Sequence, residues 1–270
     1  MGTAKRERQK AGRQSRRVEA ELAAKKSKRN RNLRNYGIYA AIIVAVVVGI
    51  VIFKGGSNNS TTATTGGTTA ATPSTAPTGT TVFSYGTTEC PPTTGATEAK
   101  KAFTAPFKQC IDPAKTYTAQ IKTNKGDLTV LLDPIKAPGT VNNFVSLSLN
   151  KFYDGLTCHR IIPGFVVQCG DPKGDGTGDA GYKFADELPQ TGDYKVGSLA
   201  MANSGANTNG SQFFIISGAQ GVALPPQYSL FGQVTTGIDD TLKALDAAGT
   251  AAGTPTKEPI IITSVTITIS

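Results

Sequence analysis

Short runs of alternating apolar and polar residues fill the C-terminal part of the chain, from residue 116 to residue 270. Alternation with a period of two places one row of side chains on each face of a strand, so these runs predict half-buried β-strands. Turn residues separate the runs, as at Asn124-Lys125-Gly126, where a hairpin is expected. The predicted strands cover residues 117–123, 128–132, 156–162, 165–169, 197–202, 212–216, 229–234 and 260–269.

Two segments have helical periodicity instead. The first carries Val141, Phe144 and Leu149 on one face, and Thr140 stands where it can cap the helix N-terminus. A second helix is expected over residues 238–245. About eight strands and two helices predict a mainly β domain, and many short strands with frequent turns are typical of a barrel or a sandwich. Periodicity alone leaves both architectures open.

The segment at residues 35–53 has no charged side chain and is rich in Ile, Val and Ala. At helical rise it reaches roughly the thickness of a bilayer hydrocarbon core, and Tyr36 and Tyr39 suit the interface at one end. These features predict a single transmembrane helix. A buried globular helix is disfavoured because the segment has no polar face. A cleaved signal peptide is disfavoured because no clear small-x-small cleavage site follows Phe53.

Positive charge is concentrated before this apolar segment. Residues 1–34 hold thirteen Lys and Arg and three Glu, a net charge of +10, whereas the rest of the chain holds fifteen basic and sixteen acidic residues. The positive-inside rule places such a basic tail in the cytoplasm and the following domain outside. We therefore expect a single-pass protein of the cell membrane whose residues 35–53 contact lipid. The tail lacks interleaved aromatic residues and leads directly into the apolar segment, so specific nucleic-acid binding is disfavoured.

Residues 54–115 are dominated by Gly, Ser, Thr, Ala and Pro, with few apolar side chains to bury. Such a composition is typical of a linker that forms no packed core. The sequence therefore predicts a Gly/Ser/Thr/Pro-rich stalk, followed by one folded domain at residues 116–270.

Histidine and cysteine usage limits the chemistry. His159 is the only histidine, which excludes a Ser-His-Asp mechanism elsewhere in the chain. No CxxC motif or His-rich cluster predicts a metal site, and we expect no metal and no cofactor. The four cysteines are on the predicted exported side, where disulfides are expected: Cys90, Cys110, Cys158 and Cys169.

Two longer segments carry a more specific signal than periodicity. They read CHRIIPGFVVQCGD at residues 158–171 and SLAMANSGANTNGSQFFI at residues 198–215. In composition, order and separation, both resemble the signature segments of cyclophilins, and the resemblance extends from about Tyr117 to the C-terminus. Within that family, the chain is similar to the membrane-anchored, exported cyclophilins of bacteria. The resemblance implies a closed eight-stranded antiparallel barrel capped by two α-helices.

The resemblance also implies peptidyl-prolyl cis-trans isomerase activity on proline-containing peptides and exported client proteins. Rotation about an X-Pro bond has a barrier of about 18–20 kcal/mol, because amide resonance must be broken. No covalent bond breaks, so a catalyst needs only to bind the twisted amide better than either planar isomer. Arg160 is the only arginine outside the tail, and we expect it to donate a hydrogen bond to the prolyl nitrogen. The alternative roles for Arg160 are a surface salt bridge or a side-chain stem packed on the barrel.

The other site residues follow from the matched segments. Gln168 and Phe165 join Arg160 as expected catalytic residues. The proline ring needs an apolar pocket, and the peptide backbone needs donors and acceptors, with Asn203 expected to act through its main chain. The residues that the resemblance assigns to substrate binding are Val166, Ala202, Asn203, Gln212, Phe214, Leu224 and Tyr228.

The chain has no tryptophan. Family members that bind cyclosporin tightly usually carry one just before the region of Leu224, where this chain reads Val222-Ala223. We therefore expect weak cyclosporin binding. His159 precedes Arg160 and is expected on the opposite face of its strand, in a structural, hydrogen-bonded role.

Cys158 and Cys169 are equally spaced from Pro163-Gly164, so a two-residue hairpin would place them opposite each other, within disulfide reach. The same register would place Arg160 and Gln168 on opposite faces. A shared site would instead require a three-residue loop or a bulge. The sequence leaves both arrangements open. The expected companion disulfide joins Cys90 and Cys110.

A non-catalytic proline-peptide binding module on the cell surface is the main alternative function. Some cyclophilin-like domains lack the arginine, whereas this chain has Arg160 within the matched segment. The isomerase is therefore the favoured prediction.

Overall fold

Residues 83–270 are described by the computed structural model, and the predicted tail at 1–34, the anchor at 35–53 and the first part of the stalk lie outside them. Within residues 83–270, none of the helices has the length and apolar character that crossing a membrane requires.

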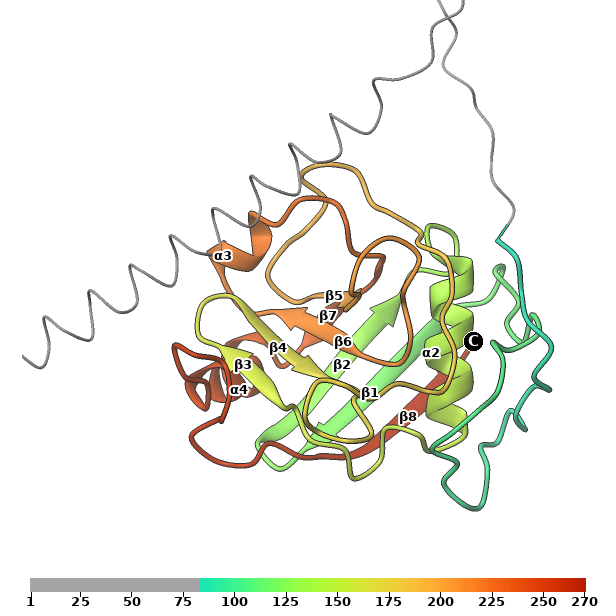
Figure 1. The fold of residues 1–270 in the computed structure, drawn as a ribbon, viewed down its shortest axis with the longest axis horizontal. Helices are drawn as coiled ribbons and strands as arrows, with labels where there is room; N and C mark the ends of the chain where they lie inside the picture. Colours follow the sequence, from blue (N-terminus) through green and yellow to red (C-terminus); the bar gives the residue numbers. More distant parts are fainter. Residues whose placement is uncertain (1–82) are drawn as a thin grey trace, which may run out of the picture. The chain divides into compact units, whose positions relative to one another are not determined.

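Eight antiparallel strands form one curled sheet around a buried core (Figure 1). Their spatial order is β3-β4-β6-β5-β7-β2-β1-β8. Each strand falls within or close to a predicted alternating segment, so the mainly β class is confirmed. The strands are β1 (Tyr117–Thr123), β2 (Gly126–Leu132), β3 (Arg160–Ile162), β4 (Val166–Cys169), β5 (Ser198–Met201), β6 (Phe213–Ile216), β7 (Leu230–Thr236) and β8 (Ile262–Ile269).

The predicted closed barrel is not formed, because the edge strands β3 and β8 do not pair with each other. The segment before β3 instead meets the start of β8 around an isolated bridge between Thr157 and Ile261, where three backbone hydrogen bonds link Gly155, Leu156 and Cys158 to Ile260 and Ile262. The free edge of β3 is covered by a loop instead: the Ile161 N–H donates to the Gly253 carbonyl, and the Thr250 N–H donates to the Ile161 carbonyl. Because this loop occupies the edge of β3 that would otherwise pair with β8, the sheet remains a curled half-barrel.

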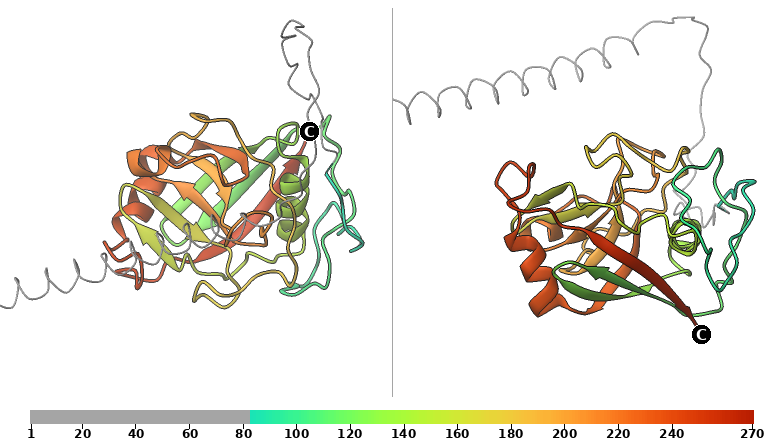
Figure 2. Two further views of the ribbon diagram at one scale, coloured as in Figure 1. Left: turned by 45° about the horizontal axis from the view of Figure 1, so that its top comes forward. Right: turned by 90° about the horizontal axis from the view of Figure 1, so that it is seen from below.

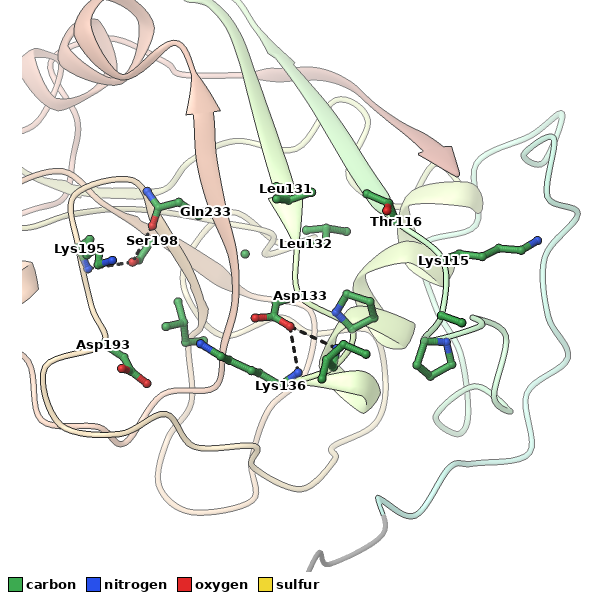
Figure 3. Close-up of a pocket in the computed structure, with 16 residues that line it drawn as sticks. Lys115, Thr116, Leu131, Leu132, Asp133, Lys136, Asp193, Lys195, Ser198 and Gln233 are labelled. Atoms are coloured by element: carbon green, nitrogen blue, oxygen red, sulfur yellow. Dashed lines mark hydrogen bonds between the residues drawn. The ribbon is translucent and has the colours of Figure 1, made fainter. Parts of the chain in front are cut away.

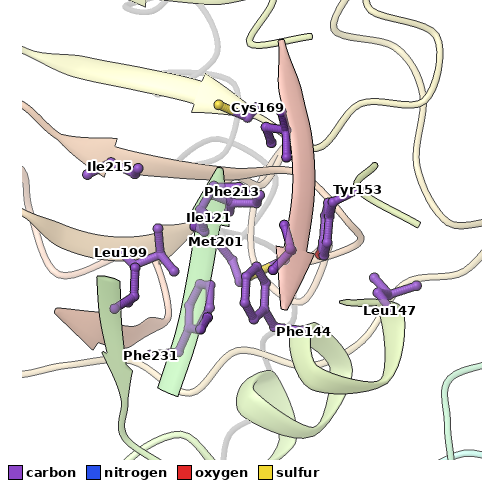
Figure 4. Packing of buried hydrophobic residues seen from close by; sticks show 14 of the residues in the cluster. Ile121, Phe144, Leu147, Tyr153, Cys169, Leu199, Met201, Phe213, Ile215 and Phe231 are labelled. Carbon is purple, nitrogen blue, oxygen red and sulfur yellow. The ribbon is translucent and has the colours of Figure 1, made fainter. Parts of the chain in front are cut away.

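Large side chains from alternate strand positions fill the space inside the curl (Figure 4). Phe144 of the first helix packs there against Tyr153, Phe213 and Phe231, with ring centroids 5.1, 5.6 and 5.2 Å away. Phe213 faces this core, as the strand period predicts, and its neighbour Phe214 faces the other side of the sheet. The inner face therefore holds the fold together, and the outer face is left for the site.

Helix α2 (Pro138–Leu149) forms at the predicted place and lies beside one end of the curl (Figure 1). The predicted N-cap is wrong, because Thr140 lies inside the helix and Ala137 holds the cap position. The carboxylate of Glu187 supplies the missing acceptor: it accepts from the Gly139 N–H at 2.9 Å and from the Thr140 N–H and hydroxyl, both at 2.7 Å. A negative charge at a helix N-terminus also interacts favourably with the helix dipole.

The predicted second helix at 238–245 is present in two parts, a π-helical turn over Ile238–Leu242 and α4 (Lys243–Ala247). A further short helix, α3 (Ala219–Val222), was not predicted. Helix α4 lies at the end of the curl opposite α2, next to β3 and β4, as the views in Figure 2 also show.

Residues 83–115, which we predicted as part of the stalk, pack against the domain along the side of α2 (Figure 2). Phe103, Phe107 and Ile111 are buried in the main core, and the Cys90–Cys110 disulfide closes this arm on itself. The folded unit therefore extends further toward the N-terminus than the predicted boundary at residue 116. A few large apolar residues within a Thr- and Pro-rich segment are enough to attach it.

Candidate active site

The hairpin of β3 and β4 places Arg160 and Gln168 directly opposite each other, on the outer face of the sheet. Their pairing leaves residues 163–165 as a three-residue loop. Gly164 takes a φ of 73° there, which favours glycine, and its N–H donates to the Asp246 carboxylate at 2.9 Å. The loop thereby presents Phe165 next to Arg160.

Arg160 is held by a hydrogen bond and an aromatic ring. Its Nη1 donates to Gln168 Oε1 at 3.2 Å, and its guanidinium carbon lies 5.7 Å from the centre of the Phe165 ring. Within residues 83–270 no carboxylate lies within 4.0 Å of the guanidinium, so the alternative of a surface salt bridge is wrong. The remaining donors of this permanently charged group are available to a ligand.

A chain of side-chain amides fixes this geometry. Gln168 Nε2 donates to Gln212 Oε1 at 2.9 Å, and Gln212 Nε2 donates to the carbonyls of Gly176 and Gly178 at 3.0 and 2.8 Å. Because the carbonyls accept, each amide must turn its oxygen toward Arg160. The orientation of the Gln168 amide at Arg160 is therefore set by the loop that contains Gly176 and Gly178.

That loop is organised by Asp171, a buried carboxylate that accepts hydrogen bonds from the N–H groups of Lys173, Asp175 and Gly176. The described residues contain no cluster of three or more groups suited to hold a metal.

An apolar pocket lies beside Arg160 on the outer face. Phe214 and Tyr228 meet edge to face, with ring centroids 5.3 Å apart, and Val166 and Leu224 belong to the same cluster. The pocket has a volume of about 220 Å³ and brings together all but one of the predicted site residues. These are Arg160, Phe165, Val166, Gln168, Ala202, Asn203, Phe214, Leu224 and Tyr228.

Gln212, the remaining predicted residue, lines an adjacent cavity of about 100 Å³. The Asn203 side chain makes two hydrogen bonds: Nδ2 donates to the Gln227 carbonyl of the segment before β7 at 2.9 Å, and Oδ1 accepts from the Gly205 N–H of its own loop at 3.2 Å. Both contacts engage the side chain, and the expected role of the Asn203 main chain toward a ligand stays a prediction. The two cavities adjoin, because Gln168, Ala202 and Asn203 line both of them.

The family model described as Cyclophilin type peptidyl-prolyl cis-trans isomerase/CLD matches residues 118–267. The chain belongs to the cyclophilin family. It is 43% identical over 172 residues to a protein of Mycobacterium tuberculosis described as a probable peptidyl-prolyl cis-trans isomerase B, covering 58% of this chain and 54% of that protein. It is 40% identical over 177 residues to peptidyl-prolyl cis-trans isomerase B of Streptomyces anulatus, covering 57% and 98%.

The chain thus spans about half the length of the M. tuberculosis relative. Among solved structures, a cyclophilin type peptidyl-prolyl cis-trans isomerase of Cryptosporidium parvum, crystallised in the presence of the dipeptide Ala-Pro, is 34% identical. The two structures superpose with a TM-score of 0.52 over 56% of this chain and 98% of the other.

Tyr194 is a residue of this cyclophilin site that the sequence did not reveal. It packs in the pocket cluster, its hydroxyl donates to the Tyr228 carbonyl at 2.7 Å, and it accepts from the Tyr228 N–H at 3.1 Å. Burial raises the pKa of Tyr194 to about 12. No local pattern identifies it, because it lies in a loop far from Tyr228 in the sequence.

The predicted hydrogen-bonded role of His159 is wrong. Both ring nitrogens are buried without a partner within the described part of the chain. Burial lowers the pKa of His159, with Asp171 as a smaller opposing influence. A neutral imidazole is therefore favoured in the folded cyclophilin domain.

Both predicted disulfides, Cys90–Cys110 and Cys158–Cys169, are present. The Cys158–Cys169 bond coexists with the three-residue loop that places Arg160 and Gln168 on one face. The two arrangements that conflict in the sequence are compatible because Cys158 lies before β3. It can therefore bond to Cys169 of β4 without being directly opposite it in the strand register.

Proposed function

We propose that this protein is a peptidyl-prolyl cis-trans isomerase that accelerates rotation about X-Pro bonds in exported or cell-surface proteins and so assists their folding. The observation that carries this proposal is the position of Arg160. Its guanidinium has no acidic partner in the described residues and lies at the entrance of an apolar pocket that fits a proline ring.

The chemistry follows from what happens to the amide during rotation. In the planar amide the nitrogen lone pair is delocalised, and in the twisted state it is localised on a pyramidal nitrogen. A donor at that nitrogen stabilises the twisted state and neither planar isomer, which is the differential binding that catalysis requires. Arg160 is suited to this because its orientation is fixed in advance by Gln168 and Phe165.

The rest of the site would hold the peptide still while one half of it rotates. Phe214, Leu224 and Val166 would bury the ring, with Tyr228 closing the pocket. Ala202, Asn203 and Gln212 line the path that leads from the pocket into the neighbouring cavity, where the residues before proline would lie. The Ala-Pro dipeptide used with the C. parvum relative supports a proline-containing ligand.

Placement at the cell membrane is part of the proposal. Residues 35–53 would anchor the chain, residues 1–34 would remain in the cytoplasm, and the cyclophilin domain would lie outside. The two disulfides support an oxidising compartment, because such bonds persist mainly in exported proteins. Clients would then be exported proteins with X-Pro bonds.

The test is proline isomerisation of a short Ala-Ala-Pro-Phe peptide by the full chain, beside the Arg160→Ala variant. We expect acceleration over the uncatalysed rate by the native protein and a large loss in the variant. Tight peptide binding without acceleration by the native chain would reject the isomerase and favour the non-catalytic binding module.

A further inference from the structure

The outer face of the sheet continues well beyond the proline pocket. Register pairs link Arg160 to Gln168, Gln168 to Phe214, Phe214 to Ala200 and Ala200 to Leu230. Paired strand residues lie on the same face, so this row leads from the catalytic arginine across four further strands. Leu230 packs against the pocket cluster on one side. On its other side it lines a second and larger hollow.

This hollow, which we call the outer-face groove, consists of two adjoining cavities of about 600 and 350 Å³. Figure 3 shows residues that line the larger one. Both cavities are lined by Lys136, Asp193 and Leu230. The walls come from the arm before β1, the end of β2, the turn before α2 and the loop before β5. The residues that matter for the argument are Leu131, Ile135, Lys136, Leu188, Lys195 and Leu230.

Apolar side chains are unusually exposed here. Leu131 is 45% exposed, Ile135 73% and Leu188 53%. The described residues include five large exposed apolar side chains, and these three line the groove, whereas the others do not. Exposed apolar residues that gather in one concave place are typical of a contact surface, whereas isolated ones are not.

The charges at the groove are unevenly engaged. Asp133 accepts from the backbone N–H groups of Ile135 and Lys136, as Figure 3 shows, and Asp193 accepts from the Gln190 N–H. The ammonium groups of Lys136 and Lys195 have no ion pair or hydrogen bond within residues 83–270. Unused donors beside an apolar floor suit a ligand that brings carboxylates and apolar side chains together.

We infer that the outer-face groove is a second contact site for the client chain, one that binds an extended segment with alternating apolar and acidic residues. This inference rests on the proposed function, because the same polypeptide would place its X-Pro bond in the pocket. The shared outer face supports this occupant, because a chain that leaves the pocket past Leu230 reaches the groove without crossing an edge of the sheet. Linking two weak contacts raises the apparent affinity without any change in the chemistry.

The test compares two peptides with the full chain. The short peptide is Ala-Ala-Pro-Phe, and the long one continues through a flexible Gly/Ser linker into six residues of alternating leucine and glutamate. We expect the KM of the long peptide to be lower than that of the short peptide by a factor of about ten or more, with the same kcat. The double variant Leu131→Ser/Ile135→Ser should raise that KM to the value for the short peptide. Both side chains are exposed, so the fold should be retained.

Charge is tested with Lys136→Glu, which should also abolish the advantage of the long peptide. Lys122→Glu is the matched control, because Lys122 is an exposed lysine of β1 away from the groove and should leave the advantage intact. Equal KM values for the two peptides with the native protein would overturn the inference. Equal binding of a leucine–lysine segment would overturn its acidic specificity.

The groove can also be tested without isomerisation, by fluorescence anisotropy of the labelled leucine–glutamate segment alone. Binding that the double variant abolishes would support the groove even if the short peptide were not isomerised, which would reject only the proposed function. Loss of a dimer in the double variant, seen by sedimentation, would instead assign the groove to a second copy and overturn the client assignment.

Discussion

Removal of the Cys158–Cys169 disulfide should reduce catalysis, whereas removal of Cys90–Cys110 should not. The first bond ends two residues before Arg160 and one residue after Gln168. Strand β3 is only three residues long and pairs with β4 on one side and with the loop of Thr250 and Gly253 on the other, so we expect the adjacent disulfide to contribute to its position. The second bond lies in the arm beside α2, far along the chain from the site.

The two bonds should contribute similarly to stability, which makes them a matched pair. Their cysteines are separated by 11 and 20 residues. The chain-entropy relation gives about 3 kcal/mol for either loop, with a difference of only about 0.5 kcal/mol between them. For a domain of this size, that loss should lower Tm by about 6–12 °C. A displacement of the guanidinium by about 1 Å can reduce the rate as much as 100-fold.

The assay uses the Cys158→Ala/Cys169→Ala and Cys90→Ala/Cys110→Ala double variants, with Tm from calorimetry and kcat from the short peptide. We expect similar losses of Tm and a fall in kcat, about tenfold or more, only in the first variant. Equal kcat values in the two folded variants would show that the disulfide does not position Arg160, and the reasoning would be refuted.

Three further predictions concern other parts of the domain. Glu187→Ala should cost about 2 kcal/mol of stability in chemical unfolding, because α2 loses the acceptor at its N-terminus, while isomerisation persists; an unchanged stability would contradict the role of Glu187. Burial lowers the pKa of His159 in the folded protein, so as the pH falls the unfolded chain binds a proton at this residue before the folded chain does. The contribution of the neutral His159 to the free energy of unfolding is therefore complete above about pH 6.5 and declines as the pH falls below that value. Tm should therefore drop more between pH 7.5 and 5.5 in the native protein than in His159→Gln, and equal drops would contradict this. Cyclosporin should inhibit weakly and Ala223→Trp should strengthen inhibition, whereas tight inhibition of the native chain would contradict the expectation.

Local patterns predicted the strands, whereas the pocket residues were predicted from the resemblance to cyclophilins. The alternation around Phe213 and Phe214 assigns one ring to the core and the other to the site, and the structure has both as predicted. The nine residues gathered around the pocket come from segments whose similarity to cyclophilins is continuous over many residues. The resemblance indicated the residues of the site but left the register of the β3–β4 hairpin open, and the structure shows it to have a three-residue loop.

Contacts between distant segments account for the failures. Glu187 caps α2 from 47 residues away along the chain, so the nearer Thr140 was the only cap visible in the sequence. The loop of Thr250 and Gly253 covers β3 and keeps the sheet open, which no strand pattern encodes. Tyr194 reaches Tyr228 from a loop without periodicity. In each case the decisive partner is identifiable only once the chain is folded.

The central claim is that Arg160 stabilises the twisted amide and contributes little to holding the planar peptide. Exchange NMR spectroscopy on a saturating Ala-Ala-Pro-Phe peptide measures the interconversion rate on the protein, and a titration of the same sample gives the Kd. For Arg160→Ala we predict a rate about 100- to 1,000-fold lower with a nearly unchanged Kd. An unchanged rate, or a loss confined to Kd, would contradict the account.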